Sequence, residues 1–318
     1  MKLLFFGSSE FSVPFLEEIY TSNHRILKVV TAPDKKQGRG KKVLPNPVKK
    51  SSMELGVDFI EAEKIDDELI ESISKTVFDC IVVVSSGLIL PKKLLDLAPD
   101  MCINVHPSLL PKHRGPSPII STLLNGDDKT GVSIIKMVEK VDAGDIYIQA
   151  EFGIDSDDNR DVLENKLEKV GCPLLVATLD LIEGTGLTTI PQCDRDATFT
   201  SMIRKEDLKI NWKSSAVEIV NKVRAFSSKP GCYCLWRKNR IKILKAGVFE
   251  DGNRYKSNFG REEKCGTILI ADKKTGILVK CGNDEIVKIE RLKAPGKNVI
   301  SAIDFVNGYC VKAGEIFG

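Results

Sequence analysis

The stretch Met101-Cys102-Ile103-Asn104-Val105-His106-Pro107-Ser108-Leu109-Leu110-Pro111 decides the fold of the N-terminal part of this chain. Its first five residues form an apolar run that predicts a buried strand, and Pro107 ends the strand because proline has no N–H for a ladder bond. In open α/β sheets, side chains at the carboxyl ends of strands face the crevice where ligands bind. We therefore expect Asn104 and His106 to face a binding crevice.

Patterns typical of strands and helices alternate on the N-terminal side of this stretch. Apolar runs predict strands at 3–6, 26–32, 57–60 and 80–84, and helical spacing predicts helices at 12–20, 65–73 and 92–97. The alternation predicts an α/β fold with a doubly wound, mostly parallel sheet and right-handed crossovers. The turn Phe6-Gly7-Ser8-Ser9-Glu10-Phe11 lacks the glycine pattern of dinucleotide-binding folds, which argues against a dehydrogenase.

The C-terminal part of the chain has a different pattern. A long helix at 159–183, broken or kinked near Pro173, is followed by a polar stretch and then by helices at 215–225 and 301–307. Short strands are predicted at 232–237, 241–248, 266–271, 276–281 and 285–292, which together suit a small β-barrel of the oligonucleotide-binding kind. Because 318 residues exceed the usual size of one core, we expect a catalytic domain at 1–190, a linker at 191–205 and a barrel domain at 206–318.

Composition narrows the class of protein. No apolar run reaches the roughly 18 residues of a membrane span, and Met1 is followed at once by a strand pattern without a signal or transit peptide. We therefore expect a cytoplasmic protein. The nine cysteines show no C-x-x-C pair or metal-ligand spacing, so reduced thiols, no disulfide framework and no zinc are expected.

A basic segment from Lys35 to Met53 stands out, although the net charge is only +3. It contains seven Lys and Arg residues and no acidic residue: Lys35, Lys36, Arg39, Lys41, Lys42, Lys49 and Lys50. Glycines and prolines interrupt it, so a helix cannot run throughout and we expect an exposed, mobile loop. Composition alone favours a solvated loop, with a contact to nucleic-acid phosphates as the alternative.

Asn104, His106 and Asp142 are the candidate catalytic residues. Asp142 lies beside Ala143-Gly144, between runs at 132–137 and 146–148 that are typical of strands. Acyl transfer to an amine builds negative charge on an oxygen, and losing one hydrogen-bond donor to it often costs ~3 kcal/mol. A carboxylate near the imidazole is expected to raise the histidine pKa and to accept a proton. A histidine after a strand is more often structural, so spacing alone leaves this site open.

A longer motif reduces that ambiguity. The segment Ser108-Leu109-Leu110-Pro111-Lys112-His113-Arg114-Gly115-Pro116-Ser117-Pro118-Ile119, between Asn104-Val105-His106 and Asp142-Ala143-Gly144-Asp145, resembles the signature of the folate-dependent formyltransferases. The similarity covers nearly the whole chain, through Ala32-Pro33-Asp34, Gly38-Arg39-Gly40-Lys41-Lys42, Lys205-Glu206-Asp207, Lys229-Pro230-Gly231 and Asp304-Phe305-Val306-Asn307-Gly308.

The resemblance implies a reaction and a set of roles. It implies formyl transfer from 10-formyltetrahydrofolate to an amine, and the chain is most similar to members whose acceptor is methionine on initiator tRNA. Asn104, His106 and Asp142 would be the catalytic trio, without a metal. Ser108, Leu109, Leu110, Pro111, Gly87 and Leu88 would bind folate, and Arg39, Lys41 and Lys42 would bind tRNA. The barrel would bind the rest of the tRNA, and His113 would face tRNA or the surface. Apart from the resemblance, we expect a monomer, because no apolar helix face is left without an evident core.

Two other classes stay open at this point. One is a formyltransferase on the same scaffold that acts on an amino sugar nucleotide or glycinamide ribonucleotide, for which a basic segment at 35–50 is unnecessary. The other is an RNA-binding relative without activity, which the intact trio argues against. Ser85, Ser86 and Lys140 depart from the family's usual residues, and we expect them to affect folate affinity.

Overall fold

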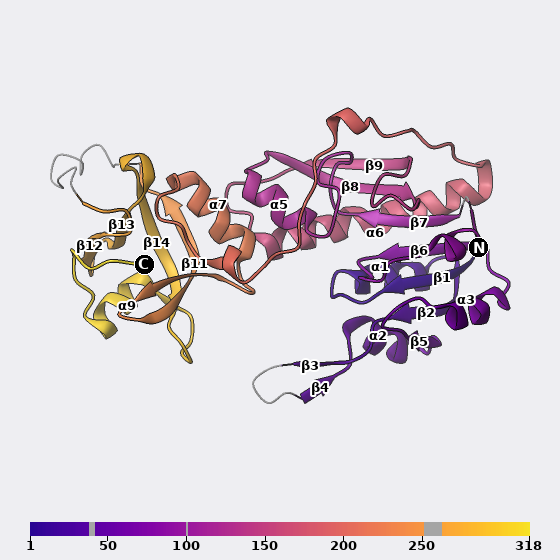
Figure 1. Ribbon diagram of the computed structural model, residues 1–318, viewed down its shortest axis with the longest axis horizontal. Helices are drawn as coiled ribbons and strands as arrows, with labels where there is room; N and C mark the ends of the chain where they lie inside the picture. Colours follow the sequence, from indigo (N-terminus) through magenta and orange to yellow (C-terminus); the bar gives the residue numbers. More distant parts are fainter. Residues whose placement is uncertain (38–41, 100, 251–262) are drawn as a thin grey trace. The chain divides into compact units, whose positions relative to one another are not determined.

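The computed structural model describes residues 1–37, 42–99, 101–250 and 263–318 (Figure 1). The contacts divide them into two compact units. Unit 1 comprises Met1–Pro118, Lys129–Gly153 and Glu164–Thr200, and unit 2 comprises Ile119–Asp128, Ile154–Leu163 and Ser201–Gly318. Because the units alternate along the chain, the linear division at 191–205 stays a prediction.

Unit 1 is built on a seven-stranded sheet with the order β5-β2-β1-β6-β7-β8-β9. The strands are β1 (Lys2–Gly7), β2 (Arg25–Thr31), β5 (Phe59–Glu61), β6 (Cys80–Val84), β7 (Cys102–His106), β8 (Lys129–Lys136) and β9 (Ile146–Gly153). Neighbours from β5 to β7 run parallel, whereas β8 is antiparallel to both β7 and β9. The prediction of a mostly parallel sheet is confirmed.

Side chains alternate in direction along a strand, so the apolar residues of these strands point to both faces of the sheet. Helices cover both faces. Leu4 and Phe6 of β1 share a buried cluster with Leu69 of α3 (Asp67–Ser74) and Leu94 of α4 (Lys92–Leu95). Elsewhere in unit 1, α1 (Ser12–Thr21) meets α6 (Arg160–Thr185), where a Cβ at Gly171 would come within 2.8 Å of Phe15. These contacts explain the apolar residues at helical spacing.

Two predictions about elements of unit 1 need correction. The helix α6 continues through Pro173, so the predicted break is absent, while the alternative of a kink stays a prediction. The basic segment is not one loop: β3 (Lys35–Gln37) pairs with β4 (Lys42–Leu44), and α2 (Pro47–Leu55) follows. The Asn46 side chain accepts the Lys49 N–H at 3.0 Å and caps α2, which starts with proline at a position that needs no N–H.

Unit 2 contains the expected small β domain. Its strands are β10 (Cys232–Trp236), β11 (Asn239–Val248), β12 (Ile268–Asp272), β13 (Gly276–Lys280), β14 (Ile286–Lys293) and β15 (Ile300–Ser301), in the order β10-β11-β14-β13-β12 with β15 beside β14. The helices are α5 (Pro118–Asn125), α7 (Ala216–Phe226) and α9 (Ala302–Tyr309). No helix in the described part of the chain is long and apolar enough to cross a membrane.

The last residues of the chain connect the two edges of this sheet. Leu235 of β10 and Gly318 exchange backbone N–H···O bonds of 2.6 and 2.7 Å. On the other side, Ile268 of β12 donates its N–H to the Glu315 carbonyl at 2.8 Å. Residues 315–318 thus lie between β10 and β12 and close the sheet into a barrel, which leaves fewer unpaired edge groups.

Candidate active site

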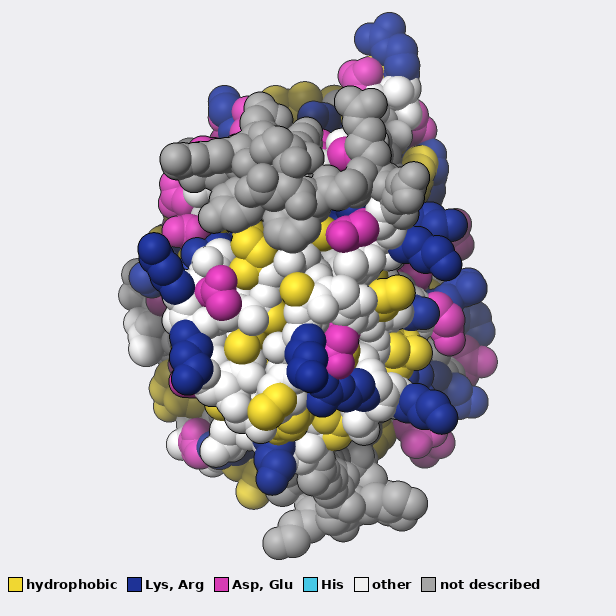
Figure 2. All heavy atoms as spheres, turned by 90° about the vertical axis from the view of Figure 1, so that its left-hand side faces the viewer, with side chains coloured by type: hydrophobic (Ala, Val, Ile, Leu, Met, Phe, Trp, Pro, Cys, Tyr) yellow, Lys and Arg dark blue, Asp and Glu magenta, His cyan; other side chains and the backbone are white. Residues whose placement is uncertain are grey.

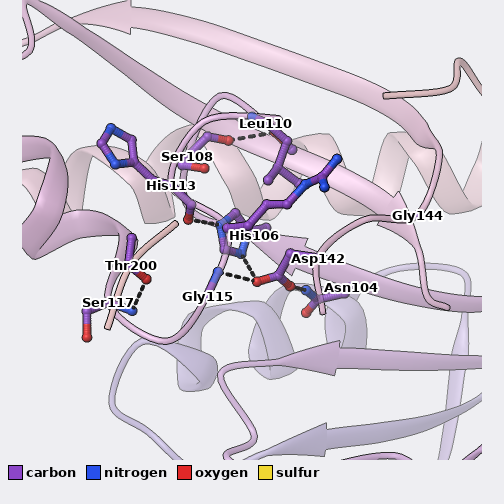
Figure 3. A network of polar contacts seen from close by, with 12 residues as sticks. Asn104, His106, Ser108, Leu110, His113, Gly115, Ser117, Asp142, Gly144 and Thr200 are labelled. Carbon is purple, nitrogen blue, oxygen red and sulfur yellow. Dashed lines mark hydrogen bonds and ion pairs between the residues drawn. The ribbon is translucent and has the colours of Figure 1, made fainter. Parts of the chain in front are cut away.

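Asn104, His106 and Asp142 come together at one end of β7 (Figure 3). Asn104 and His106 are two residues apart on β7, and Asp142 lies in the loop between β8 and β9. The Asn104 Nδ2 donates to Asp142 Oδ1 at 3.2 Å, and the His106 Nδ1 lies 3.5 Å from Asp142 Oδ2. The structure therefore assembles the three groups that sequence spacing singled out.

The Asp142 carboxylate is held in place by its surroundings. The Gly115 N–H donates to Asp142 Oδ2 at 2.8 Å, so the motif that follows His106 turns back onto the carboxylate. The backbone of Asp142 has a φ of 51°, which lies in the left-handed region that residues other than glycine uncommonly adopt. Two residues on, a Cβ at Gly144 would collide with the Lys136 carbonyl oxygen, so only glycine fits this turn.

His106 is buried, and an acceptor lies beside each of its ring nitrogens. Its Nε2 lies 3.0 Å from the His113 carbonyl oxygen, closer than Nδ1 is to Asp142. Burial lowers the pKa of His106, while the Asp142 carboxylate and the His113 carbonyl oppose this effect. The pKa of His106 is therefore lowered overall, whereas the sequence predicted a raised pKa. A neutral ring has one N–H, and the shorter contact assigns it to Nε2.

His113 corrects another expectation. We predicted that it faces tRNA or the surface, but it is buried, with a φ of 59°. Its N–H donates to the Thr198 Oγ1 at 2.8 Å, and its carbonyl faces His106. The residue therefore supports the site from within the protein.

The predicted folate segment is anchored to β8 and β9. The Ser133 hydroxyl donates to the Ser108 carbonyl at 2.6 Å and accepts the Leu110 N–H at 3.1 Å. Gln149 Nε2 donates to the Leu110 carbonyl at 2.9 Å. Ser108 and Leu110 are buried, Leu109 is half-buried, and the Leu110–Pro111 peptide bond is cis. Contacts from this segment to a ligand would therefore come mainly from its backbone.

The other residues expected near folate lie on two loops. Gly87 has a φ of 73° and is exposed, whereas Leu88 packs against the buried cluster that contains Leu4. Ser86 is buried and its hydroxyl accepts the Leu88 N–H at 3.2 Å. Lys140 Nζ lies 2.7 Å from Asp194, so it is engaged in an ion pair.

Sequence reasoning missed the contribution of the predicted linker. Arg114 donates its N–H to Thr198 and accepts from Thr200, at 2.9 and 2.8 Å. The Thr200 hydroxyl accepts the Ser117 N–H at 3.1 Å, as Figure 3 shows. Gln192 Nε2 donates to the carbonyls of Asp142 and Gly144, at 2.8 and 2.6 Å. A polar stretch without periodicity gives no signal for such contacts.

The predicted tRNA-binding residues are only partly described. Arg39 and Lys41 lie outside the described residues, and Lys42 belongs to β4. Farther along the segment, Lys49 is neutralised by ion pairs of 2.8 Å with Asp34 and 3.0 Å with Glu61. Lys49 is therefore a structural cation rather than a free one.

Basic residues of the barrel also have partners within unit 2. Arg237 pairs with Glu315 at 2.7 Å, and Lys245 pairs with Glu290 at 3.1 Å. Arg240 stacks on the Tyr233 ring, 3.9 Å from its centroid. Figure 2 shows Lys and Arg side chains interspersed with carboxylates and apolar groups on one face. Because exposed ion pairs contribute little free energy, these cations can exchange their partners for an anion that binds more strongly.

One further group of polar side chains converges in unit 1. His24 lies 3.2 Å from Asp180 and 3.7 Å from Glu183. The amino group of Met1 is 3.0 Å from Glu183 and 3.2 Å from His24 Nδ1. The positive charge of the Met1 ammonium group therefore already lies beside the carboxylates of this cluster.

Comparisons with known proteins show the family to which the chain belongs. Two families match the chain, "Formyl transferase" over residues 1–179 and "Formyl transferase, C-terminal domain" over residues 202–310. An N-formyltransferase from Helicobacter canadensis, in complex with folinic acid and dTDP-3-aminofucose, shares the fold with a TM-score of 0.66. Its sequence is 20% identical, and the matched region covers 91% of this chain and 98% of the Helicobacter canadensis chain. The fold and the matched families define this protein as a formyl transferase.

Relatives with higher sequence identity show which family of formyl transferases the chain belongs to. Methionyl-tRNA formyltransferase from Sulfurihydrogenibium sp. is 38% identical over 319 residues, covering 100% of both chains. The enzyme of the same name from Dictyoglomus thermophilum is 37% identical over 319 residues, again covering 100% of both. The chain belongs to the methionyl-tRNA formyltransferase family.

Proposed function

We propose that this protein transfers the formyl group of 10-formyltetrahydrofolate to the α-amine of methionine esterified to initiator tRNA. The observation that carries the proposal is the convergence of Asn104, His106 and Asp142 in one site, within a chain similar over its full length to methionyl-tRNA formyltransferases. We further propose that it acts as a cytoplasmic monomer, as the sequence predicts.

The chemistry asks for two things from the protein. As the amine nitrogen bonds to the formyl carbon, the formyl oxygen gains negative charge and the amine nitrogen must lose a proton. The bond between the formyl carbon and N10 of the folate then breaks, and N10 takes up a proton as tetrahydrofolate leaves. Asn104 suits the first task, because its amide nitrogen carries two hydrogens and Asp142 takes one of them. Asp142 suits the second task as the nearby carboxylate, directly or through a water molecule.

His106 needs a local exchange to act as a donor. Its Nε2 faces the His113 carbonyl and its Nδ1 faces Asp142, so both nitrogens already have partners. We propose that the formyl oxygen takes the place of the His113 carbonyl at Nε2. A buried neutral ring retains its N–H there at neutral pH, so the donor is present without an additional proton.

The residues that the structure describes fit a folate co-substrate, which supplies the formyl carbon. Hydrogen bonds from Ser133 and Gln149 hold the backbone of the 108–111 segment in place, and the Ser108 and Leu110 carbonyls each keep a second lone pair for a ligand donor. Beside Leu88 in sequence, Ile89 is 89% exposed, and beside Asp142, Val141 is 66% exposed. Large apolar side chains that are left exposed are suited to covering by an aromatic ligand.

The closing test is a formyl-transfer assay with three acceptors in parallel: methionyl initiator tRNA, glycinamide ribonucleotide and an amino sugar nucleotide. We expect transfer to the tRNA alone. Transfer only to a small acceptor would keep the catalytic trio and overturn the tRNA assignment.

The tRNA contact is proposed to include Arg39, Lys41 and Lys42, with Arg39 making the principal one because a guanidinium binds phosphates in a bidentate manner. Arg39→Ala is expected to raise the KM for tRNA and to reduce its salt dependence, with the KM for folate near the wild-type value. The control is Lys50→Ala, which removes an exposed cation of α2. Equal tRNA kinetics in the Arg39 and Lys50 variants would remove Arg39 from the contact.

A further inference from the structure

A buried guanidinium lies directly behind the Asp142 loop. Arg114 is 1% exposed, and it is among the largest fully buried side chains of the chain. Its Nε and Nη2 both donate to Gln192 Oε1, at 3.0 and 2.8 Å, and Nη1 lies 2.8 Å from Asp194. Burying a cation is costly unless its donors are matched, so this arrangement fixes the position of Gln192.

Gln192 passes that constraint to the catalytic loop. Its oxygen is oriented by Arg114, which directs its amide nitrogen toward the loop between β8 and β9. That nitrogen donates to the carbonyls of Asp142 and Gly144, at 2.8 and 2.6 Å. One of these carbonyls belongs to Asp142 itself, whose backbone has a φ of 51°, and the other lies two residues further along the same loop. Left-handed backbone of this kind persists only where surrounding contacts impose it.

Lys140 closes the same network from the other side of the loop. Its Nζ lies 2.7 Å from Asp194, whose other oxygen faces Arg114. Asp194 thus lies between two cations, and they lower the pKa of its carboxyl group, Lys140 having the larger effect. The loop is therefore attached to residues 192–194 at Lys140 as well as at Asp142 and Gly144.

We propose that Arg114 and Gln192 are positioning residues for formyl transfer, which hold the backbone of the Asp142 loop so that its carboxylate reaches Asn104 and His106. The proposal rests on the proposed function, because it assigns these residues a role through Asp142. Neither side chain needs to touch a substrate. Their effect is on the orientation of a group that does.

The test is Gln192→Met, which keeps the length of the side chain and removes its acceptor and its two donors. We expect kcat to fall by about 10- to 100-fold, because small misplacements of a catalytic group have effects of that order. The KM values for both substrates are expected to stay near wild type. Arg114→Lys is a second variant, since lysine retains the charge beside Asp194 but lacks the planar fork.

A second readout separates positioning from general destabilisation. The chain has three histidines, so their ring signals are distinguishable by NMR. If the Asp142 carboxylate moves away, His106 loses a group that favours its charged form, so its pKa falls in Gln192→Met. Thr178→Val is the matched control, because it removes a buried hydroxyl that bonds Leu174 within α6. It is expected to leave kcat and the His106 pKa unchanged.

The outcomes distinguish this proposal from the function on which it rests. Reduced kcat in both Asp142→Asn and Gln192→Met, with a shifted His106 titration in each, supports the proposal. Reduced kcat in Asp142→Asn with normal kcat in Gln192→Met overturns the positioning role and leaves the proposed function intact. Normal kcat in Asp142→Asn overturns the role of Asp142 itself.

Discussion

Asp142 is the residue on which the proposed chemistry depends most directly. Its two carboxylate oxygens accept hydrogen bonds from two neutral donors, Oδ1 from Asn104 and Oδ2 from the Gly115 N–H. Asp142→Asn keeps the shape of the side chain, removes its charge and gives up one of these two hydrogen bonds, because asparagine has a single acceptor oxygen. We expect kcat to fall by about 100-fold or more and the KM values to change little, because the lost charge matters most in the transition state. Steady-state kinetics with each substrate varied in turn measure this.

The buried imidazole of His106 makes a prediction about pH. Burial lowers its pKa in the folded protein, so below about pH 6.5 the unfolded chain binds the proton more readily. The contribution of this group to stability is therefore present above that pH and decreases as the pH falls. NMR titration of the ring is expected to show a pKa below that of a histidine in a denatured chain. A value above it would mean that the Asp142 carboxylate outweighs burial.

At the residue scale, the sequence indicates the three polar groups of the proposed site but not the residues that support them. Asn104 and His106 are found from their spacing on a strand end, and Asp142 from a turn beside glycine. Arg114 and Gln192 are 78 positions apart, and an arginine in a motif and a glutamine in a polar stretch have many ordinary uses. Their pairing depends on how two segments meet in space, which local patterns do not encode.

The loop between β8 and β9 has a steric requirement at one position. A methyl group at Gly144 would collide with the Lys136 carbonyl oxygen. The Lys136 N–H also donates to the Asp145 carbonyl at 2.9 Å, so relieving the collision would strain this bond. Gly144→Ala is expected to displace Asp142, lower kcat by about 10-fold or more and lower the melting temperature.

Gly184 near the end of α6 provides the matched control for Gly144. A Cβ there meets nothing within 4 Å, so alanine fits and stabilises the helix by up to about 1 kcal/mol. Thermal unfolding and kinetics of the two variants together test the steric argument. Equal melting temperatures and equal kcat for both alanine variants would contradict it.

Elements were predictable where local pattern and tertiary packing agree. The helix α6 shows where they differ, since Pro173 removes one backbone N–H at a cost of about 3 kcal/mol. Leu167, Leu175 and Leu179 are fully buried on either side of the proline, and each buried leucine contributes roughly 1.5–3 kcal/mol. Burial therefore outweighs the local cost, and the expected break does not occur.

The barrel of unit 2 depends on residues far apart in sequence. Phe317 is 1% exposed and stacks on Trp212 with ring centroids 6.0 Å apart, within the segment that closes the sheet. Phe317→Ala is expected to lower the free energy of unfolding of this unit by about 3–5 kcal/mol. Denaturant unfolding followed by tryptophan fluorescence measures the loss, with Ile316→Ala as the control because Ile316 is 50% exposed. Similar losses in both variants would argue against a structural role for the closing segment.

The attachment of residues 192–200 to the signature motif has a consequence for recombination between relatives. A junction at the polar stretch near Pro191 follows the linker predicted from the sequence, yet it would exchange Gln192, Asp194, Thr198 and Thr200 for residues that evolved beside another motif. A crossover after Thr200, where unit 1 ends, keeps these partners together. Hybrid enzymes joined there are expected to inherit turnover from one parent and the barrel surface from the other.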